Sequence, residues 1–162
     1  MSSQTAILHG QGAPSPAVMP IDTDTGRPQL SPEAKALLAS ARQAAFEQAA
    51  QGRLGDGLHL LCDALTLDPQ CHEVMADISA LLLAAGELQM AADYAMRALQ
   101  ARPAHGPSLY TLGFARAGLG DVSGAVAALL RLMQPDARAS LRAEAPELEP
   151  LAQAELARLQ GH

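Results

Sequence analysis

Two stretches of equal length decide the fold: GRLGDGLHLLCDALTLDPQCHEVMADISALLLAA at residues 52–85 and GELQMAADYAMRALQARPAHGPSLYTLGFARAGL at residues 86–119. Each opens on a glycine, and a third glycine, Gly120, stands 34 positions after the second. Two prolines, Pro69 and Pro103, keep the same spacing. A fixed period with glycine at one break and proline at the other predicts a helical repeat protein.

One repeat is expected to be a helix, a glycine turn, a second helix and a proline-marked turn into the next repeat. Glycine reverses the chain tightly because it tolerates positive φ, and proline cannot continue the helix that precedes it. Small residues also recur with the period, at Ala45, Ser79 and Gly113 and at Gly57, Ala91 and Ala125. They would let paired helices approach closely. A single pair cannot bury its apolar face, so a stack of three pairs is expected.

The composition also favours an all-α fold. Hydrophobic residues make up 49% of the 162-residue chain, yet only 2% of it is aromatic and tryptophan is absent. The core must therefore be built from Ala, Leu, Val and Met, which suits packed helices better than a β-sandwich. The length fits one ordinary domain.

The charge balance excludes several kinds of partner. The chain carries 17 acidic and 11 basic residues, a formal net charge of −6, which argues against nucleic acid and against anionic lipid. No apolar run approaches the ~20 residues of a membrane-spanning helix, and the first residues lack the features of a signal peptide. We expect a cytoplasmic protein, and its richness in Ala, Leu, Gly and Arg suggests a bacterial source.

Three segments are predicted. Residues 1–32 form a Pro/Gly/Ser-rich disordered tail, although residues 17–21 could instead visit a groove as a tethered ligand. Residues 33–137 hold three repeats, the first opening with Ser31 as the N-cap and Pro32 at the first helical position. Residues 138–162 form a C-terminal cap, with a helix that starts at Pro146–Glu147. Its expected apolar stripe comprises Leu148, Leu151, Ala152, Leu156 and Leu159, and its expected wet face includes Glu147, Glu149 and Glu155.

The 34-residue helix-turn-helix period resembles the tetratricopeptide repeat family, with repeats starting at Leu38, His72 and Gly106. The resemblance covers residues 38 to about 137 and implies a right-handed superhelical stack of three antiparallel pairs, closed by the capping helix. The large aromatic positions of the motif differ here. They hold Ala41, Met75, Leu109, Gln48, Leu82, Arg116, Leu61, Ala95 and Leu129. The third repeat ends early at Pro135 and is rich in glycine, so we expect it to be the least stable.

The resemblance implies that a peptide binds along the concave face made by the first helix of each pair. The groove positions carried over are Arg42, Phe46, Ala76, Ala80, Leu83, Tyr110, Phe114 and Ala117, together with Ala39, Ala49, Ala50, Glu73, Ala84, Pro107 and Gly118. Three of the four aromatic residues fall in this set, either as anchors for a ligand or as core and cap contacts. Family members that hold the C-terminal carboxylate of chaperone tails carry Lys and Asn here. This chain has only Arg42, so an apolar segment is the expected ligand.

Catalysis and metal binding are not expected. The sequence has no Gly-rich phosphate loop, no G-x-S-x-G and no H-E-x-x-H, and no cofactor is predicted. Glu144, Glu147 and Glu149 are interpreted as solvated or helix-start residues. One alternative is a zinc site at His59, Cys62, Cys71 and His72, but their spacing matches no zinc pattern. A buried structural Cys62 beside turn residues is the favoured interpretation.

Three hypotheses for function remain. The first is a protein–protein interaction module, such as an adaptor, assembly factor or chaperone, that holds an apolar segment of a protein partner. Its specific form is a class II chaperone of type III secretion, which is similar in size, in its three repeats and in its extra final helix. The second is a self-associating structural module that forms a homodimer. The third is a metal-dependent activity around His59, Cys62, Cys71 and His72.

Overall fold

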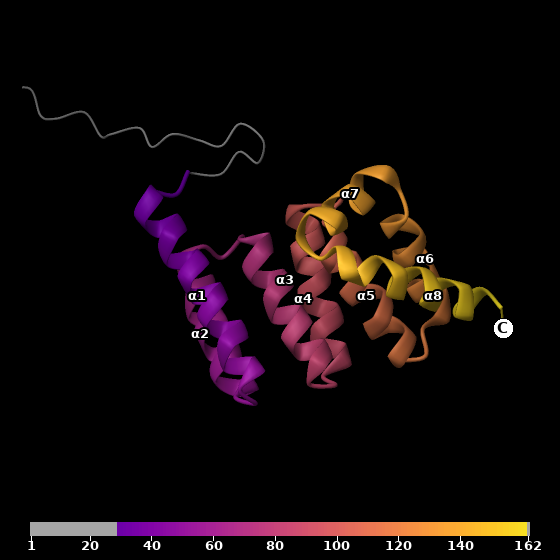
Figure 1. Ribbon diagram of the computed structural model, residues 1–162, viewed down its shortest axis with the longest axis horizontal. Coiled ribbons are helices and arrows are strands. Elements are labelled where there is room, and N and C mark those ends of the chain that lie inside the picture. The colour runs from indigo at the N-terminus through magenta and orange to yellow at the C-terminus, as the bar shows by residue number, and fades with distance from the viewer. Residues whose placement is uncertain (1–28, 162) are drawn as a thin grey trace, which may run out of the picture. The chain divides into compact units, whose positions relative to one another are not determined.

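Every regular element in the described part of the chain, residues 29–161 of the computed structural model, is a helix. The helices, coloured in order along the chain in Figure 1, are α1 (Pro32–Ala50), α2 (Leu54–Leu67), α3 (His72–Ala84), α4 (Leu88–Ala101), α5 (Gly106–Gly118), α6 (Val122–Leu132), α7 (Pro135–Glu144), the short 3-10 helix η1 (Pro146–Leu148) and α8 (Glu149–Gln160). The predicted all-α class is confirmed. The predictions for residues 1–28, including the tethered ligand at 17–21, lie outside the described residues.

The first six helices form three antiparallel pairs that stack in chain order, α1 with α2, α3 with α4 and α5 with α6 (Figure 1). The first helices α1, α3 and α5 are neighbours on one face of the stack. The predicted start of the first pair is confirmed: Pro32 opens α1, and the Ser31 side chain accepts a hydrogen bond of 3.1 Å from the backbone N–H of Ala34. This is the bond that an N-cap serine makes. None of the helices in the described residues is both long and apolar enough to cross a bilayer.

A glycine lies in the turn between the two helices of each pair, as the period predicts. Gly52, Gly86 and Gly120 have φ of 78°, 79° and 82°, a left-handed conformation that residues with a Cβ rarely adopt. At the first of these turns the backbone N–H of Arg53 donates to the carbonyl of Gln48 at 2.9 Å, and the other two turns repeat this bond. Each first helix therefore ends in a Schellman motif, which satisfies carbonyl groups that would otherwise lack partners.

Proline marks the turns between pairs. Pro69 and Pro103 occupy the second position of turns closed by backbone bonds, from Cys71 to the Asp68 carbonyl at 3.0 Å and from His105 to the Arg102 carbonyl at 3.1 Å. Proline presets the φ that this position needs. The recurring glycine and proline therefore determine the turn within each helix pair and the turn between successive pairs.

The small residues at fixed positions lie where paired helices touch. Ala45, Ser79, Ala91 and Ala125 are each fully buried. A Cβ added to Gly57 in α2 would lie 2.5 Å from the carbonyl oxygen of Ala45 in α1, closer than real Cβ contacts allow. The backbones of the first pair therefore meet directly, as the sequence predicts.

The C-terminal region contains one helix more than the sequence predicted. Pro135, interpreted above as an early end, opens α7, because proline fits the first turn of a helix. A Cβ on Gly106 in α5 would lie 2.5 Å from both the Ala137 carbonyl oxygen and the Leu141 N, so α7 packs directly on α5. The backbone N–H of Gly106 also donates to Ser140 Oγ at 3.0 Å. Helix α7 therefore packs on α5 in the position that the first helix of a fourth repeat would occupy.

Helix α8 differs from its predicted faces at two positions. Ala152, Leu156 and Leu159 are buried as expected, whereas Leu151 is 52% exposed. Glu149, expected on the wet face, is buried to 8% exposure and forms ion pairs with Arg138 and Arg142 of α7. These hydrogen-bonded guanidinium groups lower the pKa of Glu149 to about 2. The charged contact places α8 against α7.

The close approach at Gly57 gives a stability test with a control in the same helix. The substitution Gly57→Ala should lower the free energy of unfolding by about 1–2 kcal/mol, because overpacking outweighs the gain in helix propensity. Gly55→Ala should be neutral or stabilising by up to about 1 kcal/mol, because nothing lies within 4 Å of its added Cβ. Urea unfolding followed by circular dichroism measures both. Equal effects would show that the two backbones do not meet at Gly57.

Candidate ligand-binding groove

A cavity of about 800 Å³ opens on the face formed by the first helices α1, α3 and α5. The turn from α7 into η1 contributes its remaining wall. The apolar lining residues are Phe46, Ala76, Ala80, Leu83, Ala84, Pro107, Tyr110, Ala145 and Leu148. The polar lining residues are Arg42, Glu73, Asp77, His105, Thr111, Glu144 and Glu147.

Nine of the fifteen predicted groove positions lie together in this lining: Arg42, Phe46, Glu73, Ala76, Ala80, Leu83, Ala84, Pro107 and Tyr110. Ala39, Ala49, Ala50 and Gly118 do not line it. Phe114 and Ala117 do not line it either and are packed against the C-terminal core cluster, which includes Leu156 and Leu159 of α8. Their role as ligand contacts remains a prediction, since the C-terminal helices already bury part of their surface.

The three aromatic residues of the predicted set have different surroundings. Phe46 is 41% exposed at the cavity. Tyr110 and Phe114 are stacked with their ring centroids 4.4 Å apart, and both contact the C-terminal core cluster. Tyr110 nevertheless lines the cavity. Phe46 is therefore the aromatic ring with the most surface left for a ligand.

Sequence reasoning missed the acidic wall of the cavity. Asp77 and His105 were not assigned to the groove, and Glu144 and Glu147 were interpreted as solvated or helix-start residues, although all four line the cavity. The last two lie at the end of α7 and in η1, where the sequence predicted no wall. The 34-residue period could have predicted this wall. The third repeat starts at Gly106, and a further step of 34 residues reaches Ser140 in α7.

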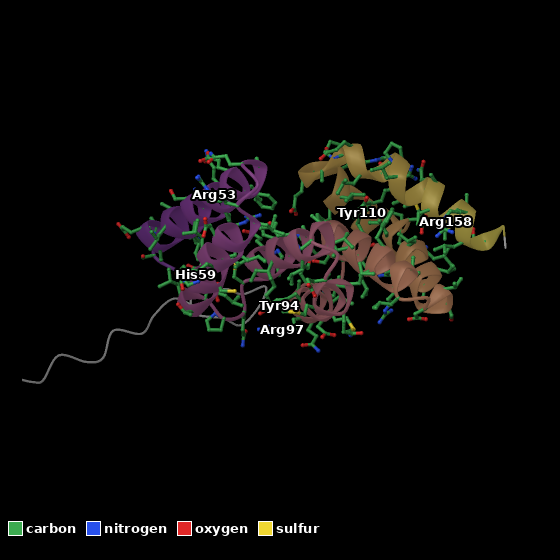
Figure 2. The ribbon with its side chains drawn as sticks, turned by 90° about the horizontal axis from the view of Figure 1, so that it is seen from below. Arg53, His59, Tyr94, Arg97, Tyr110 and Arg158 are labelled. Carbon is green, nitrogen blue, oxygen red and sulfur yellow. The ribbon has the colours of Figure 1, made fainter. Side chains whose placement is uncertain are left out.

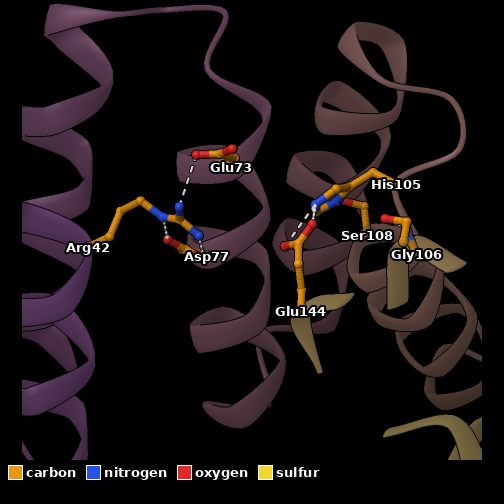
Figure 3. A network of polar contacts seen from close by, with 8 residues as sticks. Arg42, Glu73, Asp77, His105, Gly106, Ser108 and Glu144 are labelled. Carbon is orange, nitrogen blue, oxygen red and sulfur yellow. Dashed lines mark hydrogen bonds and ion pairs between the residues drawn. The ribbon is translucent and has the colours of Figure 1, made fainter. Parts of the chain in front are cut away.

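An ion-pair network joins α1 to α3 at the polar end of the cavity (Figure 3). The Arg42 guanidinium donates to both carboxylate oxygens of Asp77, at 3.2 Å for the Nη2 bond, and its Nη1 donates to Glu73 at 2.9 Å. Burial raises the pKa of Asp77, while the Arg42 hydrogen bond acts in the opposite direction. Arg42 is therefore engaged by two carboxylates of its own protein.

His105 stands across the cavity from this network (Figure 3). Its side chain is 1% exposed, with Nδ1 2.8 Å from the Ser108 hydroxyl and Nε2 3.2 Å from a Glu144 carboxylate oxygen. The His72 ring packs edge-on against it at 5.0 Å. Burial lowers the pKa of His105 to about 4, and the charge of Arg102 acts in the same direction. A neutral ring that donates from Nε2 to Glu144 and accepts from Ser108 at Nδ1 fits these contacts.

The charged lining is predominantly acidic. Four carboxylates, from Glu73, Asp77, Glu144 and Glu147, face one guanidinium, that of Arg42. His105 adds no charge at neutral pH, since its pKa lies near 4. Burial raises the pKa of Glu144, and the neighbouring charge of Glu73 raises it further. Negative charge in the cavity is therefore only partly balanced by the protein.

The alternative zinc site is not assembled among the described residues. His59 and Cys62 are exposed on α2, Cys71 is buried before α3, and His72 packs on His105. Figure 2 shows His59 far along the stack from Tyr110. Within residues 29–161 no three His, Cys, Asp or Glu side chains are grouped as metal ligands. The expectation of a buried Cys62 is wrong: Leu61 is the buried neighbour, and one helical step turns Cys62 outward.

Comparison with known proteins shows the fold. No family model matches the sequence, and no curated protein matches it. The solved structure of PcrH from Pseudomonas aeruginosa is similar with a TM-score of 0.65 and 19% identity, over 82% of this chain and 96% of that one. The first tetratricopeptide domain of Spaghetti (RPAP3), bound to the HSP90 peptide SRMEEVD, gives 0.64 and 16% over 78% and 94%. The described chain therefore has the tetratricopeptide repeat fold.

A third structure is similar over nearly its whole length. The type III secretion translocator chaperone SycD from Yersinia enterocolitica matches with a TM-score of 0.64 and 16% identity, over 77% of this chain and 92% of that chain. At such identities the likeness concerns the fold alone.

His105 predicts how stability depends on pH. In the unfolded chain this histidine titrates near its ordinary value of 6.5, whereas in the folded protein its pKa is about 4. Between these values the unfolded chain binds a proton that the folded protein does not. Stability should therefore fall as pH is lowered from 6.5 to 4, by at most about 3 kcal/mol from this residue.

The raised pKa values of Asp77 and Glu144 act in the opposite sense, so the comparison is made between the wild type and His105→Gln. Urea unfolding at pH 7.0, 6.0, 5.0 and 4.5 gives the slope for each protein. The wild type should lose more stability over this range than the variant. Parallel slopes would contradict a buried neutral His105.

Proposed function

We propose that this chain is a protein-binding module that holds an apolar segment of a partner protein in the cavity between α1, α3, α5 and the α7–η1 turn. The observation that carries the proposal is the cavity itself. Its volume of about 800 Å³ falls within the ~300–1,000 Å³ of ligand sites, and Phe46, Ala80 and Leu83 give it an apolar surface. A groove of this kind accepts an extended strand or one face of an amphipathic helix. The role is binding rather than catalysis.

Two similar structures support a peptide as the ligand. The Spaghetti (RPAP3) domain was solved with an HSP90 peptide, and PcrH was solved with the chaperone-binding region of PopD. The PcrH complex has a TM-score of 0.64 and 19% identity to this chain. Both are similar in fold to this chain, which supports a peptide as the ligand of its cavity.

The acidic lining argues against one class of ligand. The HSP90 peptide SRMEEVD carries three acidic side chains besides its terminal carboxylate. In this cavity such a tail would meet four carboxylates and a guanidinium already paired with Glu73 and Asp77. Like charges at short range repel, most strongly where water is partly excluded. We therefore propose an apolar segment and not an acidic chaperone tail.

A secretion chaperone is the more specific form of the proposal. The similarity to PcrH and SycD extends over nearly the whole of each of those chains. This role would place the protein in the bacterial cytoplasm, in keeping with its composition. Its client should be recovered in soluble form when co-expressed with this chain and should precipitate without it. A client that is equally soluble alone would exclude this form.

Self-association is the second candidate. Leu37, Leu67 and Leu151 are each more than half exposed, and exposed apolar surface can be buried between two copies. Sedimentation velocity at a series of concentrations distinguishes the two candidates. A mass that rises from monomer to dimer would favour self-association, and a constant monomer would leave the partner-binding role.

Filling the cavity tests the proposed function. Ala80→Trp places a large ring in the cavity lining and should lower recovery of the partner at least tenfold after crosslinking in the native host. Ala127→Trp is the matched control, because Ala127 is exposed on α6 and does not line the cavity. Quantitative mass spectrometry of the crosslinked proteins measures the difference, and circular dichroism checks that both variants keep their helicity. Equal recovery with both variants would contradict binding in this cavity.

A further inference from the structure

The polar and apolar linings occupy different parts of the cavity. Along α3 the carboxylates of Glu73 and Asp77 come in the first half of the helix, and Ala80 and Leu83 follow in the second half. On the opposite side, Glu144 contacts His105 at the start of α5. Glu73, Asp77 and Glu144 therefore lie toward the end of the cavity where α3 and α5 begin, and Ala80 and Leu83 lie farther along α3.

The protein's own cation does not balance this end. Arg42 is held by Asp77 and Glu73 through its Nε, Nη1 and Nη2 groups. Glu144 contacts the ring of His105, which is neutral at pH 7. Glu147 is exposed at the cavity and makes no ion pair with any of the residues that the structure describes.

The other charged and titratable groups near Glu144 leave this imbalance in place. The charge of Arg102 reaches it, but this side chain is exposed on the proline turn and does not line the cavity. His72 is half-buried, and burial and the neighbouring His105 lower its pKa. Glu73 raises the pKa of both Asp77 and Glu144. A positive charge brought by a ligand would relieve the repulsion among these carboxylates.

We propose that the cavity selects a partner segment that carries a lysine or arginine beside its apolar residues, with the cation seated between Glu144, Glu147 and Glu73 and the apolar side chains on Ala80, Leu83 and Phe46. The inference rests on the proposed function and names the chemistry of its partner. Charge complementarity of this kind sets specificity and rejects acidic competitors. The apolar contacts supply the larger part of the affinity.

A display library of random twelve-residue peptides, selected on the purified full-length protein, tests the inference. Peptides that bind the wild type and not Ala80→Trp are taken as cavity-dependent. Among these, Lys and Arg should be enriched over the unselected library. Replacing the selected cation by Gln in one synthetic peptide should raise its Kd at least tenfold in low salt, and by less in high salt, because ions screen the attraction.

Charge reversal on the protein gives the matched comparison. Glu147→Lys should weaken binding of the same peptide at least tenfold, because Glu147 lines the cavity. Asp63→Lys changes the net charge equally on the exposed surface of α2 and should change Kd less than twofold. Cavity-dependent peptides that are neutral or acidic, or equal effects of the two reversals, would overturn the inference while leaving the proposed function intact. A library with no cavity-dependent binder would overturn both.

Discussion

The direct contact of helix backbones at small residues is the constraint on which the rest of the structure depends. Gly57 in α2 faces the carbonyl of Ala45 in α1, and Gly106 in α5 faces the backbone of α7, each with no room for a Cβ. Contacts this close place each helix at one position on its neighbour, because protein interiors are close-packed and yield little. The positive φ of Gly52 and its two equivalents then returns the chain for the next helix. Together these contacts set the first-helix face that the cavity occupies.

The sequence predicted the three pairs because their signals are local and repeated. A glycine with left-handed φ and a proline at the second position of a turn act on their own few residues, so a period of 34 could be interpreted without tertiary information. Helix α7 was missed although the period continues into it, because Pro135 was interpreted as the early end of the third repeat. The contacts that hold this helix, Ala137 and Leu141 buried against α5, are about a repeat away in sequence. Cys62 was predicted to be buried but is exposed for a simpler reason. A step of one residue along a helix turns the side chain from the buried face toward solvent.

The same contrast between local signals and contacts with distant elements explains which residues of the candidate site were predicted. Residues carried on α1 and α3, such as Phe46 and Ala80, line the cavity as the repeat predicts, because their place follows from helix phase. Phe114 was expected beside them, but its ring packs on Tyr110 and on the C-terminal core cluster. Glu144 and Glu147 were missed because the α7–η1 turn brings them to the cavity. The C-terminal elements thus complete the acidic end begun by Glu73 and Asp77 on α3, and we propose that this charge disfavours acidic peptide tails.

We propose that a partner segment lies against the first helices α1, α3 and α5. An NMR titration of the isotope-labelled protein with the partner segment that crosslinking identifies, following backbone amide signals, tests this placement. We expect the largest shifts and broadenings on α3 and α5 around Ala80 and Tyr110, with Glu144 and Glu147 also affected. Shifts concentrated on the exposed surfaces of α2, α4 and α6, with Ala80 unchanged, would contradict it.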